Sequence, residues 1–170
     1  MRPRFTVWIA LLGCLLLPAV SRAEDAAKAA PAAAPTHQII LPKDLKWTDA
    51  PPSLAKGPKV AVLHGDPNAA GIFAMRILIP AGYSIPPHFH PADENMTVIS
   101  GEISMGVGDH PDPAKAHSLP AGAVSIMPAG MHHYAFTKDG CVIQVHGMGP
   151  WGITYVNPED DPRGPPDAAK

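Results

Sequence analysis

Short apolar runs, separated by turn-forming residues, occupy the chain from residue 60 to residue 156. In GIFAMRILIP (71–80), large apolar side chains alternate with smaller or polar ones, as in a strand that buries one face. The runs VAVLH, MTVIS, EISMGVG, CVIQVHG and WGITYV are equally short and rich in branched residues. No helical period of any length appears in this range. The pattern predicts an all-β sandwich or barrel.

The part of the chain before residue 60 has a different composition. Residues 24–37 are rich in alanine and proline, which predicts a flexible leader. Residues 39–41 are apolar and predict a short edge strand. Residues 42–59 carry Trp47 among prolines and lysines, and we expect an extended arm that lays this aromatic side chain onto the domain surface.

The C-terminal residues 157–170 are charged and rich in proline, which predicts a disordered tail. The expected domain therefore extends from residue 38 to residue 156, with its strand-rich part over residues 60–156.

The first 23 residues have the order of a secretory signal peptide. Arg2 and Arg4 precede a nearly continuous apolar run over residues 5–20, and small residues precede a cleavage point after Ala23. A membrane anchor is the alternative, but the run is short for spanning a bilayer. A lipoprotein signal at Cys14 fits less well, since the apolar run continues past it. The sequence thus predicts a periplasmic or secreted protein that is not membrane-bound once the signal is cleaved.

Charge and cysteine content narrow the possible partners of the exported chain. Cleavage after residue 23 leaves 10 basic and 15 acidic residues, a formal charge of −5. No cluster of basic residues is left to meet phosphates, so we expect no nucleic-acid partner. Cys141 is then the only cysteine, which excludes an intrachain disulfide and predicts a buried thiol.

Candidate chemistry gathers in the stretch GYSIPPHFHPADENMTVISG. His88 and His90 are two residues apart, so in a strand their rings project to the same face. Residues 91–93 suit a short connection, and a hairpin there would set Glu94 across from both rings. Two imidazoles and a carboxylate are metal ligands by type and spacing. The alternative is a pair of solvent-facing histidines beside a surface glutamate.

A second stretch, GAVSIMPAGMHHYAF (122–136), contains two β-rich runs joined at residues 128–130. Proline suits the second position of a turn there, and Gly130 can take a positive φ. This predicts a second hairpin.

Together the two stretches resemble the motifs of the cupin family. The first motif is met at every spacing by Gly82, His88, His90, Glu94 and Gly101. The second motif is met by Gly122, Pro128, Gly130 and His133, while Thr137 stands where the family usually has asparagine. The resemblance covers residues 60–156 and implies a small jelly-roll barrel.

The resemblance also implies a ligand set. The family's metal ligands would be His88, His90, Glu94 and His133, and the motif spacing favours His133 over its neighbour His132. These ligands suit one divalent transition ion, Fe, Mn, Zn, Cu or Ni, with positions left open for water or substrate. A homodimer is implied by the family as well, with Trp47 among the candidate interface groups.

Other residues are candidates for a pocket beside the metal. Gln144 and His146 share a face if alternation holds in CVIQVHG, and that face could line the pocket and contribute to catalysis with Glu94. For His146 the favoured interpretation is a hydrogen-bonded histidine at the end of a strand, and a base beside the metal is the alternative. Tyr83 is expected at the barrel mouth, where its hydroxyl could reach a bound molecule.

Two functions fit this site. The first is a metal-dependent enzyme, of the oxygenase type, acting on a small molecule, with Glu94 available as a base. The second is a non-catalytic cupin of the cell envelope that binds or senses a metal or small ligand, because fold alone does not fix function.

Overall fold

The computed structural model of the chain describes residues 37–164. The predicted signal peptide, nearly all of the predicted leader and the last six residues lie outside this range. Over the described residues, no helix is both long and apolar enough to cross a membrane.

Strands dominate the described part of the chain, as the alternating pattern predicted. They are β1 (Thr48–Asp49), β2 (Lys59–His64), β3 (Gly71–Ile79), β4 (Ser84–Phe89), β5 (Glu94–Val107), β6 (His117–Pro120), β7 (Val124–Met127), β8 (His133–Phe136), β9 (Cys141–Gly149) and β10 (Thr154–Tyr155). Two short 3-10 helices, η1 (Pro42–Asp44) and η2 (Pro158–Asp160), lie near the ends. The all-β prediction is confirmed.

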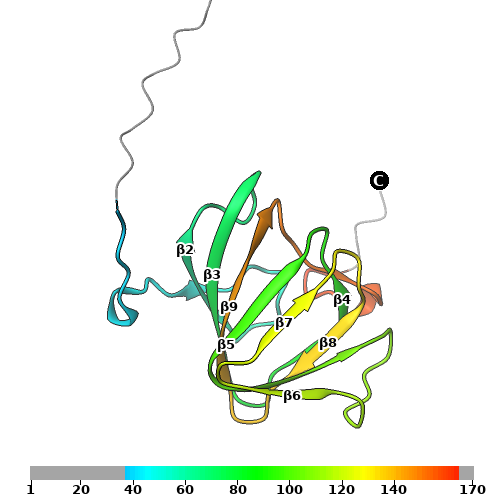
Figure 1. The fold of residues 1–170 in the computed structure, drawn as a ribbon. Helices are drawn as coiled ribbons and strands as arrows, with labels where there is room; N and C mark the ends of the chain where they lie inside the picture. The colour runs from blue at the N-terminus through cyan, green and yellow to red at the C-terminus, as the bar shows by residue number, and fades with distance from the viewer. Residues whose placement is uncertain (1–36, 165–170) are drawn as a thin grey trace, which may run out of the picture. The chain divides into compact units, whose positions relative to one another are not determined.

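The strands form two antiparallel layers that share β5 (Figure 1). The first layer contains β1, β2, β3, β9, the beginning of β5, and β7. The second contains β6, the end of β5, β8, β4 and β10. The strand passes between layers near Gly101, whose φ is +74° and where an added Cβ would lie 2.3 Å from the carbonyl oxygen of Gly140. Only glycine fits that position without strain.

The core lies between the two layers and follows the predicted alternation. In β3 the buried positions are Phe73, Met75, Ile77 and Ile79, and the intervening residues are half-buried or exposed. The largest fully buried side chains are Tyr134, Phe73, Met96, Ile103, His133, Val98 and Val145. Burial of branched side chains on facing layers is the main stabilising contribution to such a barrel.

Neither of the two predicted hairpins forms, and this is the main correction to the sequence-based fold. The strand β4 pairs with β8 and β10, and no ladder joins it to β5 in the described structure. Likewise β7 pairs with β5, whereas β8 pairs with β4 and β5. Each connection instead crosses from one layer to the other. The sequence could not predict this, because alternation specifies which face of a strand is buried but not which strand it pairs with. We call residues 90–93 the first corner and residues 128–132 the second corner.

The arm before β2 is held by two tyrosines. The Tyr83 hydroxyl donates to the carbonyl oxygen of Ala55 at 2.8 Å, and the Tyr155 hydroxyl donates to that of Ser53 at 2.7 Å. Trp47 is half-buried, in agreement with the predicted contact on the domain, and β1 extends the first layer by pairing with β2. The strand expected over residues 39–41 is absent, and these residues are exposed.

Residues 157–164 also differ from the prediction of a disordered tail. The Asn157 side chain accepts a hydrogen bond from the Glu159 amide at 3.2 Å and caps η2. Arg163 pairs with Asp161 and donates to the carbonyl oxygen of Ile153 at 3.3 Å. The strand predicted over residues 151–156 shortens to β10, since residues 151–153 turn towards the interior site described next.

Candidate metal centre

Four polar side chains from three strands and one corner meet inside the barrel. His88 on β4 lies directly opposite His133, the first residue of β8. His90 follows in the first corner, and Glu94 begins β5 in the other layer. All four residues are buried, with exposed fractions between 1% and 7%. The strand register and the first corner thus bring together all four ligands implied by the cupin motifs.

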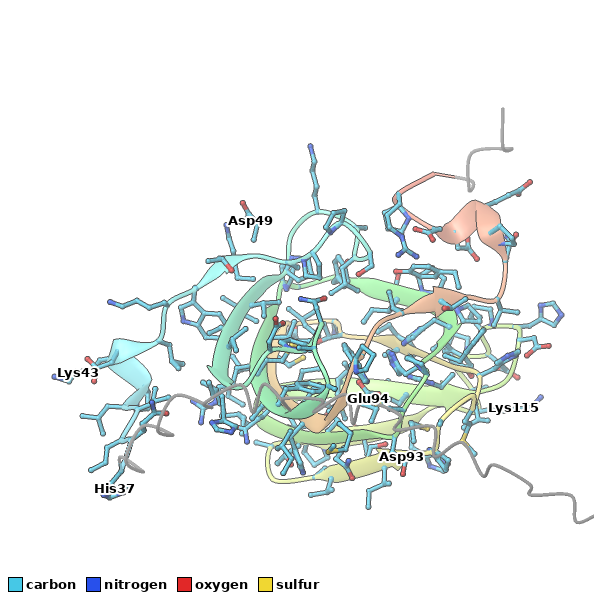
Figure 2. All side chains as sticks on the ribbon, turned by 90° about the horizontal axis from the view of Figure 1, so that it is seen from above. His37, Lys43, Asp49, Asp93, Glu94 and Lys115 are labelled. Carbon is cyan, nitrogen blue, oxygen red and sulfur yellow. The ribbon has the colours of Figure 1, made fainter. Side chains whose placement is uncertain are left out.

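The four side chains are close enough to share one ion. One ring nitrogen from each histidine lies within 4.8 Å of one from the other two. The Oε2 atom of Glu94 is 3.4 Å from Nε2 of His133 and 3.7 Å from Nε2 of His90. Figure 2 shows Glu94 near the middle of the barrel, and the residue is only 7% exposed. A carboxylate at this distance completes a set of three imidazoles and one acid.

Hydrogen bonds at the opposite ring nitrogens set the orientation of the three imidazoles. In each ring Nδ1 lies within hydrogen-bond distance of a backbone carbonyl oxygen: Pro86 for His88 at 2.7 Å, Gly152 for His90 at 2.6 Å, and Met131 for His133 at 2.9 Å. A carbonyl only accepts, so each Nδ1 carries the proton and donates it. The lone pair is left on Nε2, which is the form that binds a metal.

Burial keeps the rings of His88 and His90 in the neutral form by lowering their pKa values. Desolvation in the interior, reinforced by the neighbouring His133 ring, lowers the pKa of His88 from 6.5 to about 2. Desolvation likewise lowers the pKa of His90, although the Glu94 carboxylate opposes the shift. A neutral imidazole at physiological pH can bind a cation without first losing a proton.

The buried Nε2 atoms of His90 and His133 have no hydrogen-bond partner among the described residues. Such an atom ordinarily costs free energy, and a shared cation would satisfy both. The donor set therefore fits a metal ion, as the sequence predicted.

The two corners are hydrogen-bonded to each other beside the ligands. The Gly130 amide donates to the carbonyl oxygen of His90 at 2.9 Å. The Ala129 amide donates to Oδ1 of Asp93, also at 2.9 Å. Sequence reasoning missed the role of Asp93, since nothing in the spacing indicates that its carboxylate reaches the second corner.

The neighbouring histidine, His132, points away from the site. Its side chain is 37% exposed, its Nδ1 lies 2.6 Å from Oδ1 of Asp109, and its ring stacks on Phe89 with centroids 5.0 Å apart. The choice of His133 over His132 agrees with this geometry.

A pocket of about 790 Å³ leads to the ligands, a size within the range of small-molecule sites. His88, His90 and Glu94 lie at one part of its wall. Barrel residues that include Val60, Met75, Ile77 and Ile143 line another part, and the arm, the loop between β2 and β3 and residues 151–154 line much of the rest. The pocket wall is mostly apolar, and its charged side chains other than the candidate ligands come from Asp49, Asp66 and Arg163.

Trp151 is a pocket residue that the sequence did not single out. Its indole stacks on the His90 imidazole with centroids 4.3 Å apart and planes 18° apart. It also contacts Phe73, with centroids 5.7 Å apart. The sequence placed Trp151 at the start of a predicted strand, and its distance in sequence from His90 concealed the contact.

Gln144 and His146 do share a face of β9, as expected, but that face does not line the pocket. Val145 and Ile143 are buried on the opposite face, His146 is exposed, and Gln144 accepts a hydrogen bond from Arg76 at 3.2 Å. The expected contribution to the pocket is wrong, because β9 turns its other face inward. The Tyr83 hydroxyl is likewise occupied by the arm.

The jelly-roll layers and the buried histidine cluster define a cupin-type protein. The chain belongs to the family described as "Domain of unknown function (DUF4437)", whose model matches residues 19–154. This is a cupin-type family, so the resemblance read from the two motifs is confirmed.

A named relative agrees with this assignment over part of the chain. A segment of 73 residues, 42% of this chain, is 34% identical to germin-like protein 3-1 of Oryza sativa subsp. japonica. The match spans about a third of that relative's length (32%).

Among solved structures, the polyketide cyclase RemF from Streptomyces resistomycificus matches with a TM-score of 0.63 and 21% identity, over 75% of this chain and 90% of its own. A protein proposed to be an acetylacetone dioxygenase, from Methylibium petroleiphilum PM1, matches with a TM-score of 0.57 and 20% identity, over 76% and 87%. At these identities the matches show the fold alone.

Proposed function

We propose that this protein is an exported metal-dependent enzyme, of the oxygenase type, that acts on a small molecule. One observation carries the proposal: the four candidate ligand side chains converge at a mostly apolar pocket that reaches them. A site that only stored a metal would not need a pocket of about 790 Å³ beside it.

The residues that would hold the ion are His88, His90, His133 and Glu94. A divalent transition ion held there would supply Lewis-acid chemistry and, for Fe, Mn or Cu, exchange of electrons with O₂. Three imidazoles and one carboxylate leave coordination positions free for a substrate. Outside the reducing cytosol, the affinity order favours Cu and Zn over Mn and Fe, so selection of the ion depends on supply as well as on ligands.

The chain's own residues would do the remaining work. The apolar wall formed by Val60, Met75, Ile77 and Ile143 binds the hydrocarbon part of a substrate and excludes water. Glu94 is the acceptor for a substrate proton, since its Oε2 atom faces the cluster and its side chain is shielded from solvent. The apolar part of the lining supports a substrate with a substantial hydrocarbon part.

The alternative function is a non-catalytic cupin that binds a metal or small ligand in the cell envelope. Within the described structure, Glu94 is the one carboxylate of the pocket that lies against the histidine cluster. The alternative is supported because, among residues 37–164, no further acid or base for catalysis lies beside Glu94 and the three histidines. The fold does not decide between the two, because the same barrel carries enzymes and binding proteins.

The experiment begins with untagged mature chain, purified from the compartment in which it matures, and measures its metal content by elemental analysis. Oxygen uptake and product formation are then followed across a panel of small apolar acids, ketones and phenols, with His133→Ala as the control. Metal-dependent turnover supports the proposal. Stoichiometric metal with no turnover supports the binding alternative, and a metal content equal to that of the control contradicts the enzyme and the metal-binding form of the alternative.

Export is the second part of the proposal and has its own test. The N-terminal pattern supports cleavage after Ala23, so N-terminal sequencing of the mature chain is expected to begin at Glu24. A retained N-terminus in a cytosolic fraction would contradict export. The homodimer also stays a prediction, which sedimentation velocity on the mature chain would test.

A further inference from the structure

Two of the three histidines are oriented by their own neighbourhood in the sequence, and the third is not. Two of the rings pair with a backbone carbonyl that lies two residues earlier in the sequence. These pairs are Nδ1 of His88 with Pro86, on β4, and Nδ1 of His133 with Met131, in the second corner. Nδ1 of His90 instead pairs with the carbonyl of Gly152, 62 residues further along the chain. The orientation of His90 therefore depends on a segment outside the two cupin motifs.

That segment also covers the face of the His90 ring. The Trp151 indole lies nearly parallel to the imidazole, with planes 18° apart and centroids 4.3 Å apart. The angle between ring planes is larger for the other two candidate ligands: the rings of His88 and His133 lie at 56° to each other. Only His90 thus has both a distant hydrogen-bond partner and a stacked aromatic cover among the histidines of the cluster.

Residues 149–152 are themselves fixed against the loop between β2 and β3. The Trp151 amide donates to the carbonyl oxygen of Pro67 at 2.7 Å. At Gly149 an added Cβ would lie 2.2 Å from the carbonyl oxygen of Ala69, so the two backbones are in close contact. A segment anchored in this way can hold a side chain in place rather than merely touch it.

A hydrogen bond at one nitrogen does not by itself fix an imidazole ring. The χ2 torsion of histidine is broad, and the ring can tilt about the Nδ1–H···O contact. A flat aromatic surface against the ring removes that tilt and so defines where Nε2 points. Aromatic pairs also contribute stabilisation beyond the area they bury.

We propose that Trp151 is a positioning residue for the candidate ligand His90: the indole fixes the imidazole plane while the Gly152 carbonyl fixes its tautomer. This inference rests on the proposed function, since positioning Nε2 matters only if the site binds a metal. The contact between Trp151 and His90 is made by the ring face, with the two planes 18° apart.

The test compares three variants in the mature chain. Trp151→Leu removes the stacking surface, Trp151→Phe keeps an aromatic face, and Trp47→Leu makes the same change at a half-buried tryptophan of the arm. Should Trp151→Leu fail to fold, Trp151→Met, a flexible residue that fills irregular space, takes its place. Circular dichroism and thermal unfolding verify that each variant is folded.

The first readout needs no metal. In ¹H–¹⁵N spectra of metal-free protein at neutral pH, each histidine of the cluster is expected to give a protected Nδ1–H signal. We expect Trp151→Leu to weaken or shift the His90 signal while the signals of His88 and His133 persist. Trp151→Phe and Trp47→Leu are expected to keep all three.

The second readout is zinc affinity by calorimetry, accompanied by the visible spectrum of cobalt-loaded protein. Loss of a group that orients a metal-bound histidine typically lowers metal affinity by about 10–100-fold, and we expect a loss in this range for Trp151→Leu, with a changed cobalt spectrum. Trp151→Phe should restore most of the affinity.

Two results would overturn the inference. One is a folded Trp151→Leu variant with unchanged His90 signal and zinc affinity. The other is an equal weakening of all three histidine signals, which would indicate general loosening of the barrel. If the parent chain binds no zinc or cobalt, the proposed function fails, whereas the His90 signal in metal-free protein still tests the role of Trp151.

Discussion

The two corners that carry the candidate ligands are built in different ways. The first corner buries its ligand: His90 is 3% exposed, and Trp151 covers its ring. The second corner is exposed from Pro128 through Met131, yet the residue that follows it, His133, is among the most buried side chains of the described chain. An exposed turn therefore delivers a fully enclosed ligand.

The difference teaches that the second corner depends on the first. Its backbone is attached there through the Gly130 amide bonded to His90 and the Ala129 amide bonded to Asp93. At the opposite end of β8, the Thr137 hydroxyl donates to the carbonyl oxygen of Glu102 at 2.7 Å and accepts from the Gly140 amide at 3.1 Å. The strand β8, which carries His133, is thus attached at both ends: by the hydrogen bonds between the two corners close to the site, and by those of Thr137 far from it.

The largest effect is expected from removing the ligand that the second corner delivers. His133→Ala should abolish stoichiometric metal binding. Losing a group that only hydrogen-bonds to a metal ligand lowers metal affinity by up to roughly 100-fold, and we expect the loss of the ligand itself to exceed this. The measurement is elemental analysis of purified protein, followed by calorimetric titration with zinc.

The adjacent histidine supplies a matched control. His132→Ala removes the same side chain one residue earlier, where the ring is partly exposed and pairs with Asp109. It should keep a full complement of metal. If His132→Ala loses the metal and His133→Ala keeps it, the ligand assignment is wrong.

A smaller effect, on stability rather than on metal, is expected at the far end of β8. Thr137→Val removes the hydroxyl and leaves the Glu102 carbonyl and the Gly140 amide without that partner, which should lower the free energy of unfolding by about 1–3 kcal/mol. Thr137→Ser keeps the hydroxyl and should lose less. Urea unfolding of metal-free protein measures both, and a Thr137→Val variant as stable as the parent would show that this attachment carries little energy.

The local parts of this structure were predictable from the sequence. The alternation in β3 identified its buried face, and the spacing of His88, His90 and Glu94 identified a site whose ligands now lie together. Both predictions rest on short-range geometry: the period of a strand and the reach of a short connection. Thr137, the departure from the usual motif, is by contrast a buried group whose hydroxyl reaches the carbonyl oxygen of Glu102, 35 residues away in the sequence, and the motif did not indicate this contact.

The pairing of strands and the supports from distant segments were not predictable in the same way. The hairpin expected between β4 and β5 is a crossing between layers, because the same apolar face can be buried against either layer. Alternation likewise placed Gln144 and His146 on one face of β9 without indicating that this face is the outer one. Trp151 reaches His90 only through the complete fold, and no sequence period encodes that contact.

The smallest expected effect distinguishes the two attachments of β8. Asp93→Ala removes one exposed hydrogen bond, at a cost of about 0.5–1.5 kcal/mol, whereas Asp93→Asn keeps an Oδ1 acceptor for the Ala129 amide. If the corners position His133, Asp93→Ala should lower zinc affinity several-fold, while Thr137→Val, although it costs more stability, should lower it less. The opposite order of affinities would show that β8 is held from its far end and that the second corner is only a connection. Unfolding and calorimetric titrations on the same preparations separate the effect on stability from the effect on zinc affinity. A variant that loses stability without losing affinity has not moved the ligand.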